Sequence, residues 1–336
     1  MAQLLELDAI EISVIVDNEL DPLSPCPNEL VKQSGGVKDI SMHPSNQTST
    51  GGREAVQEFR MSNICCSAHG LSLMITGIKD GKRRTILFDT GPEEEVWERN
   101  AKRLKADIGQ VEAIVLSHWH RDHSGGMLRA IDMIESERDQ KGYHRSPVKV
   151  DLHPDRPEYR GVQIPGLPVV SLEADPTFAE IGQRFAVLET NEQPHTILDD
   201  MFLVSGKIPR VSGYESGMKF GVRFDAQKKK WVPDEEMADE RILVCRLKSC
   251  GHAGVVNSSK LTLDLGKGLP LYGVVGGFHL ADAKPEMIER TVSDLKESNI
   301  KVVLAGHCTG WRAKYEFHKQ MPGSFVPCFV GSRFEL

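Results

Sequence analysis

Short apolar runs alternate with polar stretches along most of the chain, a pattern typical of strands separated by helices and turns. Strands are expected at residues 10–16, 71–76, 85–88, 111–116, 148–152, 242–247, 271–275, 301–305 and 325–329. Apolar residues at helical spacing predict helices at 93–105, 125–137, 284–298 and 311–319. Asp80-Gly81 is a turn signal that joins two of these strands as a hairpin. The alternation predicts an α/β protein.

Two stretches interrupt this pattern. Residues 19–62 are rich in proline, glycine and polar residues, and we expect a long loop there. Such a loop is either a mobile lid over a site or a solvated insertion. Residues 154–240 contain many turn signals, with short strands expected at 185–188 and 201–204 and a polar loop at 227–240. We therefore expect one domain over residues 1–336 with elaborations in both stretches.

Five expected strands end at an aspartate or a histidine. Asp89 follows one of them, and Ser117 to Gly126 follows another with three histidines and an aspartate within six residues. His252, His279 and His307 each follow a later strand. Because α/β sheets place their ligands at the carboxyl ends of strands, we expect these side chains to form one metal site at one edge of a sheet.

The residue types in this set suit zinc or another borderline divalent metal. His118 and His120 alternate along an extended segment, so both rings can point to the same side. His252 can complete three nitrogen ligands and leave a position open for water. Asp122, His123 and His307 can hold a second ion, and Asp89 can orient one of the imidazoles. Two such ions can lower the pKa of a shared water towards ~7.

The amino-acid composition limits the classes of binding partner and the cellular compartment that we expect for this protein. The formal net charge is −7 and the densest basic run is Lys228 to Lys230, which disfavours nucleic acid. No apolar run approaches the length of a membrane span, and the N-terminus lacks the positive region of a secretory signal. Seven cysteines, an odd number, suggest reduced thiols and a cytoplasmic protein. We expect a small-molecule substrate, no membrane or nucleic-acid partner, and have no expectation for the oligomeric state.

The remaining histidines lie in loop-like or helical contexts. We interpret them as surface residues: His43, His144, His153, His195 and His318.

The motif His118-x-His120-x-Asp122-His123 resembles the signature of the metallo-β-lactamase superfamily. Phe88-Asp89-Thr90-Gly91 before it and His252 and His307 after it occur in the order expected of that superfamily. The resemblance implies a four-layer αβ/βα sandwich, with the metal site at one edge between two mixed sheets. It implies one or two Zn²⁺ ions, with Mn²⁺ or Fe²⁺ as alternatives.

A narrower resemblance is to the subgroup named for 7,8-dihydropterin-6-methyl-4-(β-D-ribofuranosyl)aminobenzene-5'-phosphate synthase. It rests on several short segments: Val16-Asp17-Asn18, His69-Gly70-Leu71-Ser72, residues 205–210, residues 251–257, residues 276–280 and residues 307–310. The superfamily usually has a bridging aspartate after the strand at 271–275, whereas this chain has Phe278-His279. A neutral imidazole cannot bridge two ions as a carboxylate does, so His279 would bind one ion or orient the substrate.

The resulting hypothesis is a hydrolase that uses zinc-bound hydroxide on an ester, lactone, thioester or phosphoester, with Asp122 orienting the hydroxide. A synthase or transferase acting on a phosphoribosyl or pterin-type substrate is the alternative, and a non-catalytic metal-binding protein is another. A di-iron oxidoreductase is disfavoured because that branch has glutamate in place of His120. His69, Arg210 with Lys207, and Tyr214 are candidate substrate-binding residues.

Overall fold

The structure is a computed structural model. It describes residues 4–36, 39, 41–44, 57–215, 217–247, 250–252, 256–266 and 269–336, and of residues 43–44 and 250–252 it describes the backbone alone.

The larger sheet has eight strands and is mixed. One half is parallel and the other half is antiparallel, beginning with the hairpin at Asp80-Gly81. Both turn residues have positive φ, 49° and 75°, as a two-residue hairpin turn of the mirror-image class requires. In spatial order the strands are β12 (Ala186–Thr190), β9 (Val148–Leu152), β8 (Val111–Val115), β7 (Lys82–Phe88), β6 (Ser72–Lys79), β2 (Ala9–Val16), β23 (Arg333–Glu335) and β3 (Lys32–Ser34).

The second sheet has six strands. Its last four strands run parallel, so their carboxyl ends lie at one edge. In order the strands are β1 (Glu6–Leu7), β18 (Arg246–Leu247), β19 (Cys250–His252), β20 (Leu271–Gly277), β21 (Val302–Gly306) and β22 (Phe325–Pro327).

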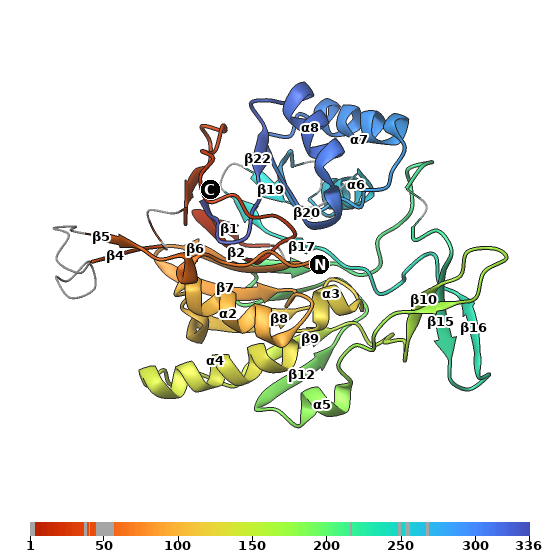
Figure 1. Cartoon of the computed structure of the whole chain (residues 1–336), viewed down its shortest axis with the longest axis horizontal. Helices are drawn as coiled ribbons and strands as arrows, with labels where there is room; N and C mark the ends of the chain where they lie inside the picture. Colours follow the sequence, from red (N-terminus) through yellow and green to blue (C-terminus); the bar gives the residue numbers. More distant parts are fainter. Residues whose placement is uncertain are drawn as a thin grey trace.

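The two sheets face each other and helices cover their outer faces (Figure 1). One hydrophobic core, with Ile12, Ile86 and Leu304, lies between the sheets. A second core packs the large sheet against α2 (Glu94–Leu104) and α4 (Met127–Lys141). A third packs the small sheet against the C-terminal helices α6 (Val256–Leu265), α7 (Pro285–Glu297) and α8 (Trp311–Gln320). This is the predicted four-layer αβ/βα sandwich.

Most of the expected elements are present, and three expectations were wrong. The expected strand at 242–247 is two short strands in different sheets, β17 (Leu243–Val244) and β18. The expected polar loop at 227–240 contains the strand β16 (Lys230–Pro233). The stretch 19–62 contains β3, which pairs with β23 at the edge of the large sheet, and the pair β4 (Met42–Pro44) and β5 (Gln57–Phe59). The partner of β3 lies about 300 positions away in the chain, so no local pattern indicates that pairing.

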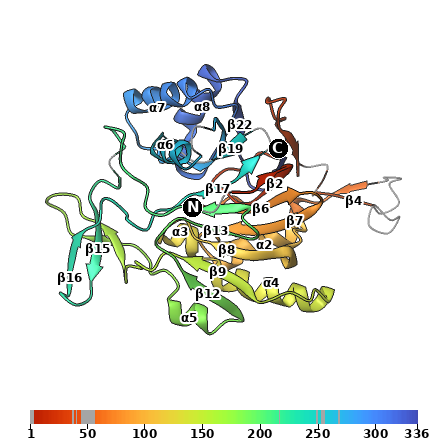
Figure 2. The ribbon, with the colours of Figure 1, turned by 180° about the vertical axis from the view of Figure 1, so that it is seen from behind.

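Three smaller sheets complete the strands. β10 (Arg160–Val162), β11 (Val170–Ser171), β15 (Gly221–Asp225) and β16 form a sheet that stands beside the four layers (Figures 1 and 2). β13 (His195–Ile197), β14 (Phe202–Val204) and β17 form the second, and β4 with β5 form the third, at the opposite end of the molecule from β15 and β16 (Figures 1 and 2). The short helix α3 (Arg121–Ser124) lies near the middle of the molecule in both views. The remaining short helices are α5 (Phe178–Gly182), η1 (Met61–Asn63), η2 (Ile108–Gln110) and η3 (His307–Thr309).

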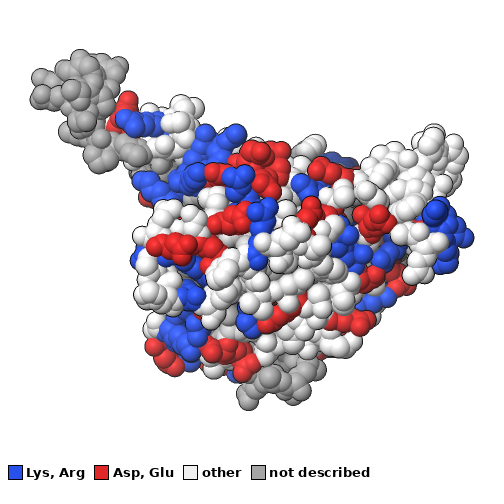
Figure 3. Space-filling view, turned by 90° about the horizontal axis from the view of Figure 1, so that it is seen from below, with Lys and Arg blue, Asp and Glu red and all other residues white. Residues whose placement is uncertain are grey.

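Acidic and basic side chains are interspersed among neutral ones on the face of the molecule seen in Figure 3. Among the described residues, none of the helices combines the length and the apolar character needed to cross a bilayer.

Asp151 at the end of β9 is a buried charge that joins three parts of the fold. Its carboxylate accepts hydrogen bonds from Arg241 (2.7 Å), His195 Nε2 (2.7 Å) and Asn191 (2.8 Å). Burial alone would raise the pKa of Asp151, but His195 and Arg241 lower it below its ordinary value. His195 and His153 are therefore not surface residues as expected: His195 is partly buried in this network, and His153 is buried.

The pair of His195 and Asp151 predicts a pH-dependent stability. The hydrogen bond to Asp151 raises the pKa of His195 above its ordinary value. The pair therefore stabilises the fold fully below the unfolded pKa of about 6.5, and this contribution is lost as the pH rises through the higher folded pKa. We expect His195→Gln to lower the free energy of unfolding by about 1 kcal/mol at pH 6 and by less at pH 9.

Urea unfolding at several pH values measures this difference. His144→Gln is the matched control, because His144 is exposed, and it should change little at any pH. A difference for His195→Gln that stays constant from pH 5 to pH 9 would contradict the expectation.

Candidate metal centre

The motif of residues 118–123 lies just beyond the end of β8, and its first two histidines face each other. His120 is the residue at which α3 begins, and its backbone is still extended, so the rings of His118 and His120 lie on the same side. His118 Nε2 and His120 Nδ1 are 3.0 Å apart, close to the separation of about 3.3 Å for two nitrogen ligands on one tetrahedral zinc ion. His120 Nε2 is buried and has no hydrogen-bond partner among the described residues. The pair has the geometry of one half of a metal site.

Trp119, between these two histidines in the sequence, fixes the direction in which their side chains point. Its side chain is fully buried, and its indole N–H donates to the carbonyl oxygen of His153 at 3.0 Å. The anchored ring makes residue 119 point into the core, and the alternation then sends residues 118 and 120 to the opposite side. Burial lowers the pKa of His120 to about 4, and burial, followed by the charges of His123 and His120, lowers that of His118. Both rings are neutral near pH 7, as metal ligands must be.

Asp89, directly after β7, orients the opposite end of the motif. It is completely buried, and its carboxylate accepts hydrogen bonds from Ser117 N (2.7 Å), Ser117 Oγ (2.8 Å) and His123 Nδ1 (2.7 Å). With its Nδ1–H committed to Asp89, the ring of His123 presents Nε2 to the site. Burial would lower the pKa of His123, but Asp89 and Asp122 outweigh it and raise the pKa to about 9.

Asp122 contacts candidate ligands that follow strands of both sheets. Its Oδ2 lies 3.6 Å from His123 Nε2 on the same helix and 3.3 Å from His307 Nε2, which follows β21 of the other sheet. Burial would raise the pKa of Asp122, but His123, His307 and His118 lower it well below its ordinary value, so the carboxylate stays ionised. Asp122, His123 and His307 thus converge from the ends of strands in the two sheets.

His307 is positioned by two residues from the end of β2. Its backbone N–H donates to Asp17 Oδ2 at 2.8 Å, and its Nδ1 lies 2.9 Å from Asn18 Oδ1. Burial raises the pKa of Asp17 to about 6, although Lys314 and the hydrogen bonds from the His307 and Glu19 backbones lower it. Asp17 and Asn18 lie 290 and 289 positions before His307, and the sequence pattern assigned them no role in the site.

A buried ion pair outside the motif forms hydrogen bonds with the backbone of Trp119. Asp239 accepts a hydrogen bond from Trp119 N at 2.8 Å, and Arg160 donates to Trp119 O at 2.8 Å and pairs with Asp239. The side chains of Arg160 and Asp239 are 3% and 0% exposed. The sequence offers no local signal for this pair, because its members lie in the stretch without a clear pattern and 79 positions apart.

Comparison with known proteins agrees with this arrangement. A family model described as the metallo-beta-lactamase superfamily matches residues 70–183, which contain the motif. A 7,8-dihydropterin-6-methyl-4-(beta-D-ribofuranosyl)-aminobenzene-5'-phosphate synthase of Methanocaldococcus jannaschii is 28% identical over 282 residues, covering 79% of this chain and 89% of that protein. An uncharacterized protein of the same organism is 29% identical over 253 residues, covering 73% of this chain and 85% of its own.

A solved structure of a metal-dependent hydrolase of the beta-lactamase superfamily has the same fold. It superposes with a TM-score of 0.63 at 20% identity and covers 96% of this chain and 98% of its own. Residues 70–183 thus resemble the metallo-β-lactamase superfamily in sequence, and the whole chain has the fold of the solved hydrolase.

The two remaining candidate ligands follow strands of the second sheet. His252 is the last residue of β19, which runs parallel to β20, and its side chain lies outside the described residues. His279 is exposed, has a positive φ of 53°, and forms no hydrogen bond or ion pair with another candidate ligand among the described residues. The structure therefore brings together His118, His120, Asp122, His123 and His307, and it leaves His279 apart from them.

The donor set fits the divalent metal that the superfamily usually holds. With the Nδ1–H of His123 held by Asp89 and that of His307 held by Asn18, the neutral form of each ring would present the Nε2 lone pair towards Asp122. The raised pKa of His123 keeps a proton between its Nε2 and Asp122, and a bound cation would take the place of that proton. The His118 and His120 nitrogens offer a second, all-nitrogen pair.

The candidate substrate residues divide into two groups. His69 Nε2 lies 3.5 Å from Asp122 Oδ2, beside the centre. Arg210 instead pairs with Glu240 at 2.6 Å, and Lys207 pairs with Glu236. The hydroxyl of Tyr214 donates to Asp294 at 2.5 Å, and the Arg290 guanidinium lies over its ring. Only His69 of this group contacts a candidate ligand in the part of the chain that the structure describes.

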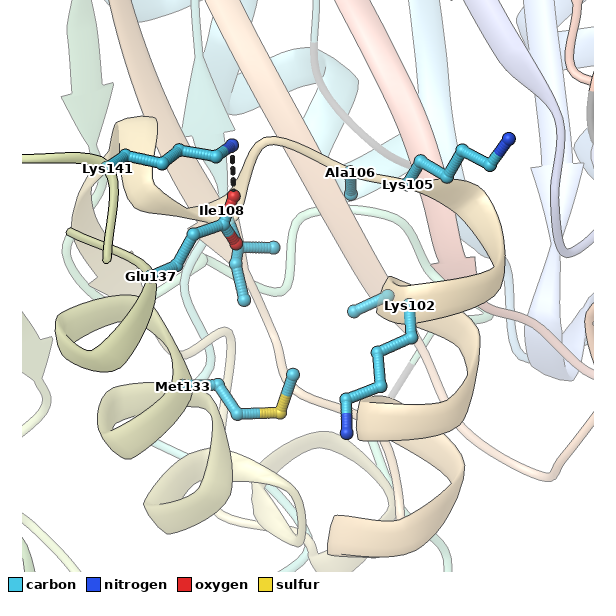
Figure 4. A pocket seen from close by; sticks show the side chains of 8 residues that line it. Lys102, Lys105, Ala106, Ile108, Met133, Glu137 and Lys141 are labelled. Atoms are coloured by element: carbon cyan, nitrogen blue, oxygen red, sulfur yellow. Dashed lines mark ion pairs between the residues drawn. The ribbon is translucent and has the colours of Figure 1, made fainter. Parts of the chain in front are cut away.

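A cavity of about 280 Å³ lies elsewhere, between α2 and α4 (Figure 4). Within it, Lys141 and Glu137 form an ion pair, while Lys102 and Lys105 come from the opposite helix. None of the candidate ligands lines this cavity, so it is separate from the metal centre.

Proposed function

We propose that this protein is a metal-dependent hydrolase that acts on an ester, lactone, thioester or phosphoester of a small molecule. The observation that carries the proposal is the convergence of Asp122 Oδ2, His123 Nε2 and His307 Nε2, with the other nitrogen of each ring held by Asp89 or Asn18. A bound zinc-like ion would lower the pKa of water and polarise the bond to be cleaved.

The side chains of the centre supply the remaining functions. Asp122 is ionised and can accept a hydrogen bond from the attacking water, which orients the lone pair of that water towards the substrate. Asp89 keeps the ring of His123 in one orientation, and Asn18 does the same for His307. His279, exposed beyond β20, is proposed as a residue that meets the substrate or one ion at the rim.

Metal analysis tests the first part of the proposal. Protein purified without chelator should contain at least one zinc-like ion per chain, measured by plasma emission spectroscopy on protein of known concentration. Removal of the ion with a chelator should abolish hydrolysis, and addition of Zn²⁺, Mn²⁺ or Fe²⁺ should restore it. Full activity of metal-free protein would overturn the proposal.

A synthase is the second candidate, because the M. jannaschii relative carries that name. A panel of chromogenic esters, lactones, thioesters and phosphodiesters separates the two. If the protein is a hydrolase, the metal-loaded protein should turn over at least one compound of the panel. The synthase predicts no turnover of the panel but binding of a phosphoribosyl compound, seen as a rise in melting temperature that depends on the metal.

A further inference from the structure

By its distance from Asp122 alone, His69 is as good a candidate metal ligand as His307. One ligand-type atom of each of His69, Asp122 and His307 lies within 4.8 Å of the others, as three ligands of one ion would. The two histidines nevertheless differ in exposure: the side chain of His69 is 71% exposed, and that of His307 is 3% exposed. The hydrogen bonds of Asn18 distinguish them further.

The orientation of the Asn18 side-chain amide is set by a backbone donor. Gly70 N–H can only donate, and it lies 3.0 Å from Asn18 Oδ1, so this atom must be the oxygen. The same oxygen lies 2.9 Å from His307 Nδ1, which therefore carries a hydrogen and donates it. The Nδ2 group of Asn18 then points at His69 Nδ1, 3.0 Å away.

The two imidazoles therefore adopt opposite tautomers. An amide NH₂ group can only donate, so His69 Nδ1 accepts and its hydrogen resides on Nε2. Nε2 is the atom of His69 that faces Asp122 Oδ2, at 3.5 Å. His307 presents a lone pair to the centre, whereas His69 presents an N–H.

The backbone holds His69 in this place. Leu71 N–H donates to the carbonyl oxygen of Asp122 at 3.2 Å, which ties the segment to the metal loop. A Cβ atom at Gly70 would lie 2.4 Å from the same carbonyl oxygen, so only glycine permits this approach. The ring of His69 is 5.1 Å from that of His307 between centroids, on the solvent side of the centre.

We propose that His69 is not a metal ligand but a catalytic hydrogen-bond donor, whose Nε2–H contacts the substrate oxygen on which negative charge develops, and that Asn18 sets this tautomer. The inference rests on the proposed hydrolase function for its catalytic part. Its structural part, the tautomer and the absence of ligation, stands apart from any activity.

Variants of His69 separate a donor from a ligand. His69→Ala should retain the metal content and metal affinity of the wild type while kcat falls about 100-fold, as for loss of one oxyanion donor. His69→Gln, whose amide N–H reaches a similar position, should recover part of that loss. His318→Ala is the control, because His318 is exposed on α8, and it should change neither quantity.

Asn18→Asp tests the role of the amide directly. An aspartate replaces the NH₂ donor with an acceptor, so His69 Nδ1 takes a hydrogen, and at a pH high enough to keep the ring neutral Nε2 loses its own. Two-bond ¹H–¹⁵N spectra of the His69 ring should show hydrogen on Nε2 in the wild type and on Nδ1 in Asn18→Asp. The variant should lose activity to the extent of His69→Ala, and the double variant should lose little more.

Several results would overturn the inference. Loss of one ion per chain, or a metal affinity at least 10-fold weaker in His69→Ala, would make His69 a ligand. An unchanged kcat with unchanged metal content would remove its catalytic role. Hydrogen on Nδ1 in the wild-type spectrum would refute the tautomer even if the variants fail to fold. If the wild type hydrolyses nothing, the proposed function and with it the catalytic part fail, while the spectrum and the metal titration still decide the tautomer and the ligation.

Discussion

Replacing His120 with alanine should abolish activity, lowering kcat/KM by at least about 1000-fold. His120 Nδ1 lies 3.0 Å from His118 Nε2, and alanine removes one of these two nitrogens while leaving the other. The ring is half-buried, and its pKa of about 4 keeps it neutral near pH 7, the form in which an imidazole binds a metal. The metal content of His120→Ala should fall together with activity, measured by emission spectroscopy and by initial rates on the best substrate.

His144→Ala is the matched control for this experiment. His144 is exposed and lies outside the centre, so its removal should leave both metal content and rate unchanged. Activity that survives the loss of His120 would refute catalysis at this centre. Retention of the full metal content without activity would place the metal on the other candidate ligands and restrict His120 to the reaction itself.

Replacing Arg160 with methionine should cause the largest loss of stability of the changes considered, about 3–5 kcal/mol in the free energy of unfolding. The variant leaves the buried carboxylate of Asp239 without its partner and also frees the carbonyl oxygen of Trp119. Because Trp119 lies between His118 and His120, we also expect the metal affinity to weaken by about 10-fold or more. Urea unfolding and metal titration measure the two effects.

Arg223→Met serves as the control, since Arg223 pairs with Asp155 near the surface, with side chains 24% and 42% exposed. Loss of this exposed ion pair should lower the free energy of unfolding by less than about 1 kcal/mol. Adding Asp239→Asn to Arg160→Met should recover part of the stability, because it removes the uncompensated charge. A cost for Arg160→Met no larger than that for Arg223→Met would contradict the role of the buried pair.

The candidate site could be predicted from the sequence as far as its ligands are local or follow strands. His118, His120, Asp122 and His123 lie within six residues, so backbone alternation and a short helix suffice to bring them together. Asp89 and His307 were recognised because each follows an apolar run, and parallel strands end at a common edge. His279 also follows a strand, yet its side chain is exposed, because the sequence does not specify where a turn directs the residue after it.

The partners that orient these ligands could not be predicted in the same way. Asn18 contacts His69 and His307, which are 51 and 289 positions away, and Asp239 contacts Trp119, which is 120 positions away. A single hydrogen bond between distant residues leaves no periodic pattern in a sequence, so only the packed chain shows which polar side chain meets which. The same reason explains the missed edge strand β3, whose pairing with β23 joins residues about 300 positions apart.

The sequence by itself determined the α/β sandwich and the identity of most candidate ligands, because apolar periodicity and closely spaced donors are local properties. Only the tertiary structure decided how those donors are oriented. Asp89 directs the hydrogen of His123 away from the centre, Asn18 does so for His307, and the same amide directs the hydrogen of His69 towards Asp122. Tautomers depend on the neighbours that fold against a ring, and those neighbours come from other parts of the chain.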